Sequence, residues 1–517
     1  MPSGGRRSTA SPESIRPPRQ RHHSQLRHNL GQKWFKSGNM SSMDQGGPAS
    51  GDDAAKTPPE KRGGALSIAA AAAVGGFLFG YDTAVVNGAV DAVQARFHLS
   101  SLVLGAAVST ALLGSAVGAW FAGPLSDRIG RVRIMLITAI VFAVSAVGSA
   151  LAVGPISLTA WRAVAGMAVG AASVIVPAYI AEIAPAEKRG RFGSLQQLAI
   201  VTGIFAALLA DYALAASAGG ASKDVPWGGE AWRWMFASAA VPAAVYLALA
   251  LRIPESPRYL VRRRRGEQAR EVLERYVGDG VRLREIERSL AGTKETIDLS
   301  DLRGATARDR RSGLLPIVWT GIILAALQQF VGINVIFYYS TTLWRAVGFT
   351  ENEALVTSVI TSVINIAGTL LAIALIDRVG RKPLLTVGAA GMVVTLGTLA
   401  WCFSRASGTG ENLTLPPGVD VVALLAANLY VVFFAASWGP TLWVLLGEMF
   451  NNRIRVTAVA VAGSAQWIAN WLVTITFPSL AHVSLPLTYG MYTAFAAVAL
   501  VFVRRVRETR GRELETM

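Results

Sequence analysis

Most of the chain consists of long apolar stretches that carry almost no charge, and this pattern limits what the chain can fold into. Of its 517 residues, 52% are hydrophobic and only 16% are charged, whereas about 25% of residues are charged in a typical soluble domain. A helix that crosses the hydrocarbon core of a bilayer needs roughly 20 mainly apolar residues. The composition therefore excludes a disordered chain, a nucleic-acid-binding domain and an ordinary soluble enzyme.

Twelve apolar runs are long enough to cross a bilayer as helices. Runs such as residues 69–79 do not alternate apolar and polar residues, as the strands of a membrane β-barrel do. The sequence therefore predicts an all-α membrane protein with twelve transmembrane helices. The predicted spans lie near residues 64–90, 101–123, 132–153, 155–181, 193–214, 231–251, 314–343, 353–376, 383–403, 421–447, 456–480 and 486–503.

The basic residues cluster on one side of the predicted membrane. With an even number of spans both termini lie on the same side, and 43 of the 49 lysines and arginines fall there. Because basic loops remain in the cytoplasm, we expect both termini to be cytoplasmic in a bacterial plasma membrane. Topology then explains the net charge of +16, so we expect contact with a lipid bilayer and no nucleic-acid partner.

Polar blocks predict the domain boundaries. Residues 1–62 are polar and basic and are expected to form a disordered cytoplasmic tail, and residues 504–517 a second cytoplasmic tail. A six-helix bundle is predicted for residues 63–251 and another for residues 314–503. Residues 252–313 combine many charges with apolar residues at helical spacing, which predicts short cytoplasmic helices between the bundles.

Three charged motifs occur once in each half of the chain, in register. The motif from Asp127 to Arg131 follows the second span and repeats from Asp377 to Arg381 after the eighth. Such duplication predicts two pseudo-symmetric bundles that rock around a central substrate site. We expect the charged helix ends to latch the bundles in the outward-open state, although topology alone accounts for arginines there. The expected latch residues are Asp127, Arg128, Arg131, Glu182, Arg189, Glu255, Arg258, Asp377, Arg378, Arg381, Glu448 and Arg455.

Two ionisable residues, Asp82 and Arg162, are the ones expected well inside the spans. At a rise of 1.5 Å per residue both lie about 10–12 Å below the outer surface, so they can pair. Charges within the membrane are costly and are generally functional, and a carboxylate that gains and loses a cationic partner changes its proton affinity. We therefore expect the pair to couple proton movement to transport; the alternative is a static ion pair that joins two helices.

Side-chain amides and aromatic residues line the middle of several spans. An amide offers both a donor and an acceptor to a sugar hydroxyl, and an aromatic ring offers an apolar face. We expect a sugar site, although buried amides also join helices to one another. The candidates are Gln196, Gln197, Gln328, Gln329, Asn334, Tyr338, Asn365, Trp438, Gln466, Trp467, Asn470 and Trp471.

These motifs resemble those of the sugar porter family of the major facilitator superfamily. The likeness covers about residues 64–513, and the chain is similar to the bacterial proton-coupled hexose and pentose symporters. Its cytoplasmic motifs depart from the usual pattern at Val132, Val456 and Arg507. The motifs that carry it are Phe79-Gly-Tyr-Asp82, Asp127-Arg128-x-Gly-Arg131, Pro254-Glu-Ser-Pro-Arg258, Gln328-Gln-Phe-Val-Gly-Ile-Asn334, Trp438-Gly-Pro440 and Gln466-Trp467.

The resemblance implies roles for individual residues. Symporters of the family carry an aspartate at the place of Asp82, whereas facilitators usually carry a neutral residue. Ile204 stands where xylose-type porters carry a further glutamine, which favours a hexose such as glucose or galactose. The positions implied to contact sugar are Gln197, Gln328, Gln329, Asn334, Asn365, Trp438 and Gln466, with Phe79, Tyr338 and Trp467 beside them.

Together these features predict a monomeric, proton-coupled sugar importer that is not an enzyme. We expect no cofactor and no metal site, because the five histidines lie outside the spans' centres and no nucleotide-binding loop is present. Three alternatives remain at this stage: a passive facilitator of the same sugars, an exporter of apolar drugs or metabolites, and a sugar sensor that transports nothing.

Overall fold

The computed structural model describes residues 64–184, 189–277, 313–346, 348–407, 414–450 and 454–509, together with residues 283, 284, 286, 287 and 302. The chain divides into two units, Met1–Pro58 and Pro59–Met517, and every helix below belongs to the second. The predicted tail of residues 1–62 lies outside the described residues, as do most of the predicted linker after residue 277 and the end of the chain after residue 509.

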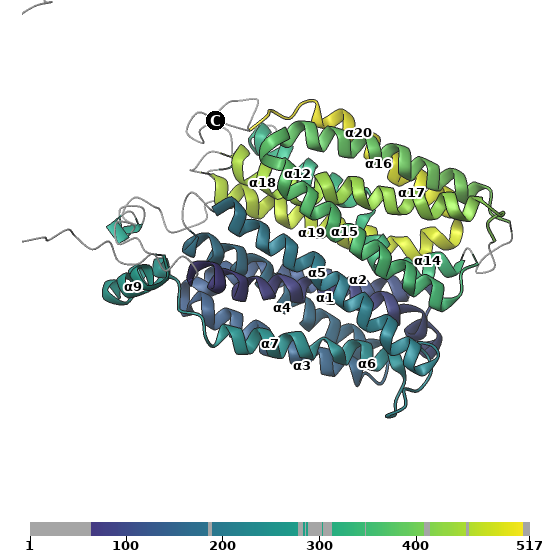
Figure 1. Ribbon diagram of the computed structural model, residues 1–517, viewed down its shortest axis with the longest axis horizontal. Helices are drawn as coiled ribbons and strands as arrows, with labels where there is room; N and C mark the ends of the chain where they lie inside the picture. The colour runs from purple at the N-terminus through teal and green to yellow at the C-terminus, as the bar shows by residue number, and fades with distance from the viewer. Residues whose placement is uncertain are drawn as a thin grey trace, which may run out of the picture. The chain divides into compact units, whose positions relative to one another are not determined.

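Twelve helical spans in the described part of the chain are long and apolar enough to cross a membrane, which confirms the predicted number and the all-α class (Figure 1). The first six spans are α1 (Gly64–Phe97), α2 (Ser101–Ile129), α3 (Arg131–Ala150), α4 (Pro155–Ile183), α5 (Arg189–Ala218), and α6 (Ala231–Ser238) with α7 (Ala240–Ala250). Short helices follow: α8 (Pro257–Arg262), α9 (Gly266–Val272) and the π-helical η2 (Leu273–Val277).

The last six spans include two that are interrupted. The seventh comprises α12 (Pro316–Phe330) and α13 (Ile333–Tyr338), and α14 (Ser340–Ala346) follows it. The tenth comprises α17 (Val419–Phe433), the π-helical η4 (Phe434–Trp438) and α18 (Gly439–Met449). The continuous spans are α15 (Glu351–Val379), α16 (Arg381–Ser404), α19 (Arg455–Val483) and α20 (Leu485–Val503).

The two halves pack their helices in the same pairs. In the first half α1 packs on α5, α2 on α4, and α3 on α4 and α7. The equivalent spans of the second half repeat these pairs, because α12 packs on α19, α15 on α17 and η4, and α16 on α17 and α20. The purple-to-teal helices and the green-to-yellow helices form two groups in Figure 1. The predicted pseudo-symmetric pair of bundles is therefore confirmed.

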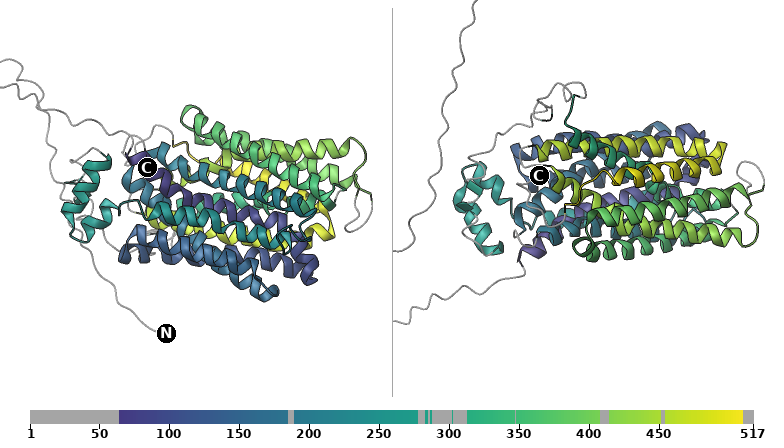
Figure 2. Two further views of the ribbon diagram at one scale, coloured as in Figure 1. Left: turned by 60° about the horizontal axis from the view of Figure 1, so that its bottom comes forward. Right: turned by 90° about the horizontal axis from the view of Figure 1, so that it is seen from above.

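Helix pairs also connect the two halves. The helix α2 packs on α19 and α5 packs on α15, while α1 contacts α13 and α14. The further views in Figure 2 show the long helices running in nearly the same direction, with α8 and α9 at one end. Between the halves, α1 and α5 therefore lie on one side and the interrupted seventh span and α15 on the other.

Two equivalent glycines make the sharp turns that follow the second and eighth spans. Gly130 has φ = +109° between α2 and α3, and Gly380 has φ = +102° between α15 and α16. A residue with a Cβ atom adopts such angles only with strain. The same backbone turn in both halves is the local structure behind the repeated Asp-Arg-x-Gly-Arg motif. We call this side of the protein, where α2 meets α3 and α15 meets α16, the basic end.

Candidate functional site

The charged pair predicted inside the membrane is formed in the structure. Asp82 on α1 and Arg162 on α4 are only 6% and 4% exposed. Arg162 Nη1 donates to Oδ1 of Asp82, and Nη2 lies 3.2 Å from Oδ2 and 3.4 Å from the Asp82 carbonyl oxygen. This two-pronged contact satisfies both carboxylate oxygens, as a charge held in a low-dielectric interior requires.

The pair also faces the second half of the protein. Tyr338, on α13, is buried, and its hydroxyl interacts with Thr83 on α1 and Asn470 on α19. Tyr338 lies within the electrostatic range of both Asp82 and Arg162. Asp82 therefore lies next to a contact between the halves.

Glutamine and asparagine side chains from the seventh and eleventh spans form a connected cluster. Gln328 donates to the carbonyl oxygen of Trp438 at 2.8 Å, and Gln466 donates to the Gln328 amide oxygen at 2.8 Å. Gln329 also donates to Gln328, at 3.4 Å, and accepts from Asn334 at 2.6 Å. Gln328 is thus the centre of the cluster, which we call the amide cluster.

Interrupted helices position the amide cluster. Gly332, between α12 and α13, has φ = +83°, and a Cβ atom there would lie 2.7 Å from the ring of Tyr492. The tenth span is interrupted before Gly439 and Pro440 by the π-helical turn η4. Interrupted spans free backbone groups near the middle of a membrane, where transporters bind their substrates.

The aromatic candidates lie in two different surroundings, either between the halves or buried inside the second half. Phe79 on α1 and Trp467 on α19 contact each other across the halves, with ring centroids 5.5 Å apart. Trp438 is fully buried, and its indole N–H donates to the Leu385 carbonyl oxygen at 2.9 Å. The Trp438 N–H group is therefore already bonded within the protein in this state.

Three further amides of the predicted set lie on α5 and α15. Gln197 is partly buried and Asn365 is 6% exposed, and neither makes a side-chain hydrogen bond to another described residue. Gln196 packs against Gly76 of α1, and its amide oxygen is buried without a partner in the described part of the chain. These amides have unused hydrogen-bonding capacity that hydroxyl groups can satisfy.

At the basic end, charged residues of the first half form one network. Glu255 accepts the backbone N–H groups of Arg131 at 2.9 Å and Val132 at 3.3 Å, which caps the start of α3. The Arg131 guanidinium contacts Asp127 at 2.9 Å and Glu182 at 3.2 Å. The network therefore joins the ends of α2, α3 and α4 to the segment before α8.

The second half repeats this network residue for residue. Glu508 accepts the backbone N–H groups of Arg381 at 3.0 Å and Lys382 at 2.8 Å. The Arg381 guanidinium contacts Asp377 at 3.1 Å and Glu448 at 2.8 Å. Repetition of backbone caps and ion pairs supports the duplication inferred from the motifs.

The ion pairs just described lie within one half each. The side chains of Arg128, Arg258 and Arg378 are exposed, and those of Arg189 and Arg455 lie outside the described residues. A latch between the halves, which was predicted for the outward-open state, stays a prediction.

We expect the two networks to contribute to stability by similar amounts. Arg131→Ala or Arg381→Ala leaves the partly buried carboxylate of Glu182 or Glu448 without its cation, which costs on the order of 3 kcal/mol. Thermal unfolding of the purified protein in detergent should shift to lower temperature for both variants. The exposed Arg133→Ala is the control; unfolding temperatures equal to that of Arg133→Ala would contradict the structural role of the networks.

The opposite end of the bundle, which we call the Asp91 end, contains contacts that join the halves. Asn87 on α1 accepts the backbone N–H of Thr341 at 3.0 Å and donates to Ser358 at 3.2 Å. Asp91 accepts from Thr342 at 2.6 Å and pairs with Arg345 at 2.8 Å. These bonds hold α1 against α14 and α15 and close the Asp91 end.

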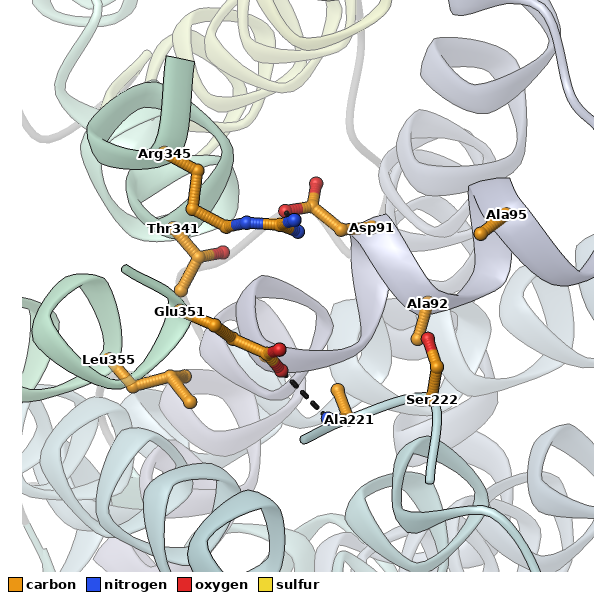
Figure 3. Close-up of a pocket in the computed structure, with 10 residues that line it drawn as sticks. Asp91, Ala92, Ala95, Ala221, Ser222, Thr341, Arg345, Glu351 and Leu355 are labelled. Atoms are coloured by element: carbon orange, nitrogen blue, oxygen red, sulfur yellow. Dashed lines mark hydrogen bonds and ion pairs between the residues drawn. The ribbon is translucent and has the colours of Figure 1, made fainter. Parts of the chain in front are cut away.

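A small polar cavity of about 140 Å³ lies within these contacts. Figure 3 shows Asp91 and Arg345 pointing toward each other, with Glu351 bonded to the backbone N–H of Ala221. Gly88 also lines the cavity. The residues of this end are not among the predicted site residues, because the sequence does not indicate which helix ends meet.

One expectation about the membrane interior is wrong. Asp82 and Arg162 are not the only ionisable residues well inside the spans, because Asp211 lies within the fifth span and is fully buried. Its Oδ2 accepts the backbone N–H of Gly88 at 3.1 Å. An acidic residue three positions before the end of the predicted span 193–214 is the signal that could have indicated it.

The fold and the site define a membrane transport protein of two bundles, with a polar cluster on the seventh, tenth and eleventh spans. A family model described as "Sugar (and other) transporter" matches residues 68–517. The chain belongs to this sugar transporter family, and it is therefore a transporter rather than an enzyme.

Relatives and solved structures agree with this assignment. The chain is 52% identical to a glucose transport protein of Synechocystis over 87% of this chain and 96% of the relative. It is 36% identical to the D-xylose-proton symporter of Escherichia coli over 87% of this chain and 94% of the relative. A partially occluded inward-open structure of the E. coli xylose transporter XylE matches with a TM-score of 0.73 at 34% identity, covering 87% and 99% of the two chains.

Proposed function

We propose that the protein is a proton-coupled sugar importer that works by alternating access. The observation that carries this proposal is the buried Asp82–Arg162 pair, which lies beside Tyr338 at the contact between the halves. The aspartate supplies a site that can bind a proton, and the amide cluster supplies hydrogen bonds for sugar hydroxyls. Both sites lie where movement of one half against the other changes their surroundings.

The proposed cycle assigns this structure to a state that is closed to the outside. We place the basic end in the cytoplasm, with both termini there, because lysine and arginine are retained on that side. The Asp91 end then faces outward and is closed by the bonds of Asn87 and Asp91 to the second half. In this state Asp82 is a carboxylate held by Arg162.

Proton binding then works through this pair. When the protein opens outward, a proton that binds Asp82 neutralises it and releases the Arg162 guanidinium from its partner. Sugar binds the amide cluster in the same state, and closure carries both to the inner side. There Asp82 gives up the proton and pairs with Arg162 again.

The amide cluster suits sugar because its members bond mainly to one another. Exchanging an amide partner for a sugar hydroxyl preserves the number of hydrogen bonds, so the site is not left with buried unsatisfied groups. Relatives of this chain are described as glucose, xylose and arabinose transporters. We propose a hexose such as glucose or galactose, since Ile204 is buried and apolar on α5 and offers no further hydrogen bond to a sugar.

The proposal also covers the location, the domains and the latch of the protein. We place the protein in a bacterial plasma membrane as a monomer, with residues 63–251 and 314–503 as its two bundles and residues 252–313 as the linker between them. In the outward-open state the charged groups at the basic end, Arg131 and Arg381 among them, would approach the opposite half and form the latch.

Uptake into proteoliposomes tests the proposed function. We expect an inwardly directed proton gradient to drive radiolabelled glucose or galactose above its external concentration, and excess unlabelled hexose to inhibit this uptake more than pentose or polyol. Uptake that only equilibrates the sugar would indicate a passive facilitator. Inhibition by apolar drugs without inhibition by sugars would indicate an exporter.

A further inference from the structure

Asp211 is a second buried carboxyl group that the proposed cycle does not use. It lies on α5 inside the membrane-spanning part and has no exposed surface. Its Oδ2 accepts the Gly88 N–H at 3.1 Å, and its Oδ1 is buried without a hydrogen-bond partner in the described part of the chain. A carboxylate in such surroundings is strongly destabilised, whereas the neutral acid is not.

The charged groups on the helices packed against α5 have other partners. Tyr81 on α1 lies within electrostatic range of Asp211, and its hydroxyl bonds to Ser238 of α6 at 2.6 Å. The charged side chains on α1, α4, α6 and α15 near this end and their partners are Asp82 with Arg162, Asp91 with Arg345, Arg96 and Arg233 with Glu230, Glu351 with the Ala221 N–H, and Glu353 with the Thr350 N–H.

Gly88 contacts Asp211 and also lines the cavity at the Asp91 end. Gly88 lines that cavity, and a Cβ atom on Gly88 would lie 2.6 Å from the Asp211 Cβ atom. The cavity is also lined by Thr341 and Leu355 of the second half, so opening of this end exposes the Gly88 segment to water. Water next to Gly88 can hydrate Asp211 and stabilise its charged form.

We infer that Asp211 is a second proton-binding site, which takes up a proton from the outer side as the Asp91 end closes. In the open state the hydrated group loses its proton as the pH rises. In the closed state it is a neutral acid, because its Oδ1 is buried and has no hydrogen-bond partner among the described residues to stabilise a charge. A rising pH therefore disfavours the closed state, and a neutral side chain at position 211 removes this pH dependence. This inference rests on the proposed alternating-access cycle.

Sugar exchange at equal pH on both sides of a proteoliposome tests the inference. The background is Asp82→Asn, in which the first proton site no longer titrates. We expect exchange by Asp82→Asn to fall with rising pH, approaching a tenfold loss per pH unit above the ionisation of Asp211. The double variant Asp82→Asn/Asp211→Asn should keep its exchange rate over the same range, because asparagine mimics the neutral acid. Coinciding profiles would overturn the inference.

One alternative variant and one control variant complete the test. If Asp211→Asn does not fold, Asp211→Ser still offers an acceptor to the Gly88 N–H and cannot ionise in this range. The exposed Asp224→Asn, on the same side of the protein, should leave the profile of the background unchanged. An altered profile for Asp224→Asn would assign the effect to surface charge and contradict the role of Asp211.

Infrared spectroscopy tests the protonation state without transport. The carbonyl band of a protonated carboxyl should be present in the purified protein at neutral pH and lose intensity in Asp211→Asn. The same band should persist in Asp82→Asn. No loss of intensity in Asp211→Asn would overturn the inference, and it would leave proton coupling through Asp82 unaffected.

Discussion

Replacing Asp82 with asparagine is expected to abolish uphill sugar accumulation while sugar exchange continues. The asparagine keeps the shape of the side chain but cannot carry a proton between the two sides of the membrane. A gradient of one pH unit is worth about 1.4 kcal/mol and supports about tenfold accumulation when one proton accompanies each sugar. The variant should lose this whole factor, so that the internal sugar concentration only equals the external one.

Exchange is the internal control for this experiment, because it requires folding, sugar binding and movement of the halves but no net proton transfer. The exposed Asp224→Asn provides a matched substitution elsewhere in the protein and should accumulate sugar as the unmodified protein does. Continued accumulation by Asp82→Asn would show that the Asp82–Arg162 pair only joins α1 to α4.

The second large effect is expected for Gln328→Leu. Gln328 bonds to Trp438, Gln329 and Gln466, so a leucine of similar size removes the centre of the amide cluster and leaves its neighbours unsatisfied. Each lost hydrogen bond to a buried group costs about 1–3 kcal/mol, which corresponds to roughly ten- to hundredfold weaker sugar binding. The sugar concentration for half-maximal exchange should rise by this factor.

A matched control is available on the surface. Gln268→Leu makes the same substitution at an exposed position of α9 and should not change sugar affinity. If Gln328→Leu and Gln268→Leu bind sugar equally well, the amide cluster joins helices and the sugar binds elsewhere.

The fold was predictable because it depends on patterns that a bilayer imposes. The absence of charge over long runs gives the number of spans, and the repeated motif around Arg131 and Arg381 gives the duplication. The equal depth of Asp82 and Arg162 follows from counting residues along two helices of known direction. The structure brings this pair together, and it joins Gln328, Gln466 and their neighbours in one cluster.

What the sequence could not provide is the contacts between helices that are distant along the chain. Nothing local to Asn87 or Asp91 indicates that they meet the second half at Thr341 and Arg345, because these contacts depend on the state of the transporter. Nor does a span boundary drawn from hydropathy show whether Asp211 lies in water or is buried against Gly88. The sequence also does not show that the ring N–H of Trp438 bonds to the Leu385 carbonyl oxygen, because this bond depends on how the helix is rotated about its axis.

The most direct test of the central claim is to measure proton movement during sugar entry. Adding glucose or galactose to energised cells that express the protein should make the medium alkaline, and the Asp82→Asn variant should give no such change. The protein is a proton symporter if each pulse of sugar removes protons from the medium. Sugar entry at an unchanged external pH would contradict the account and would make the protein a passive facilitator.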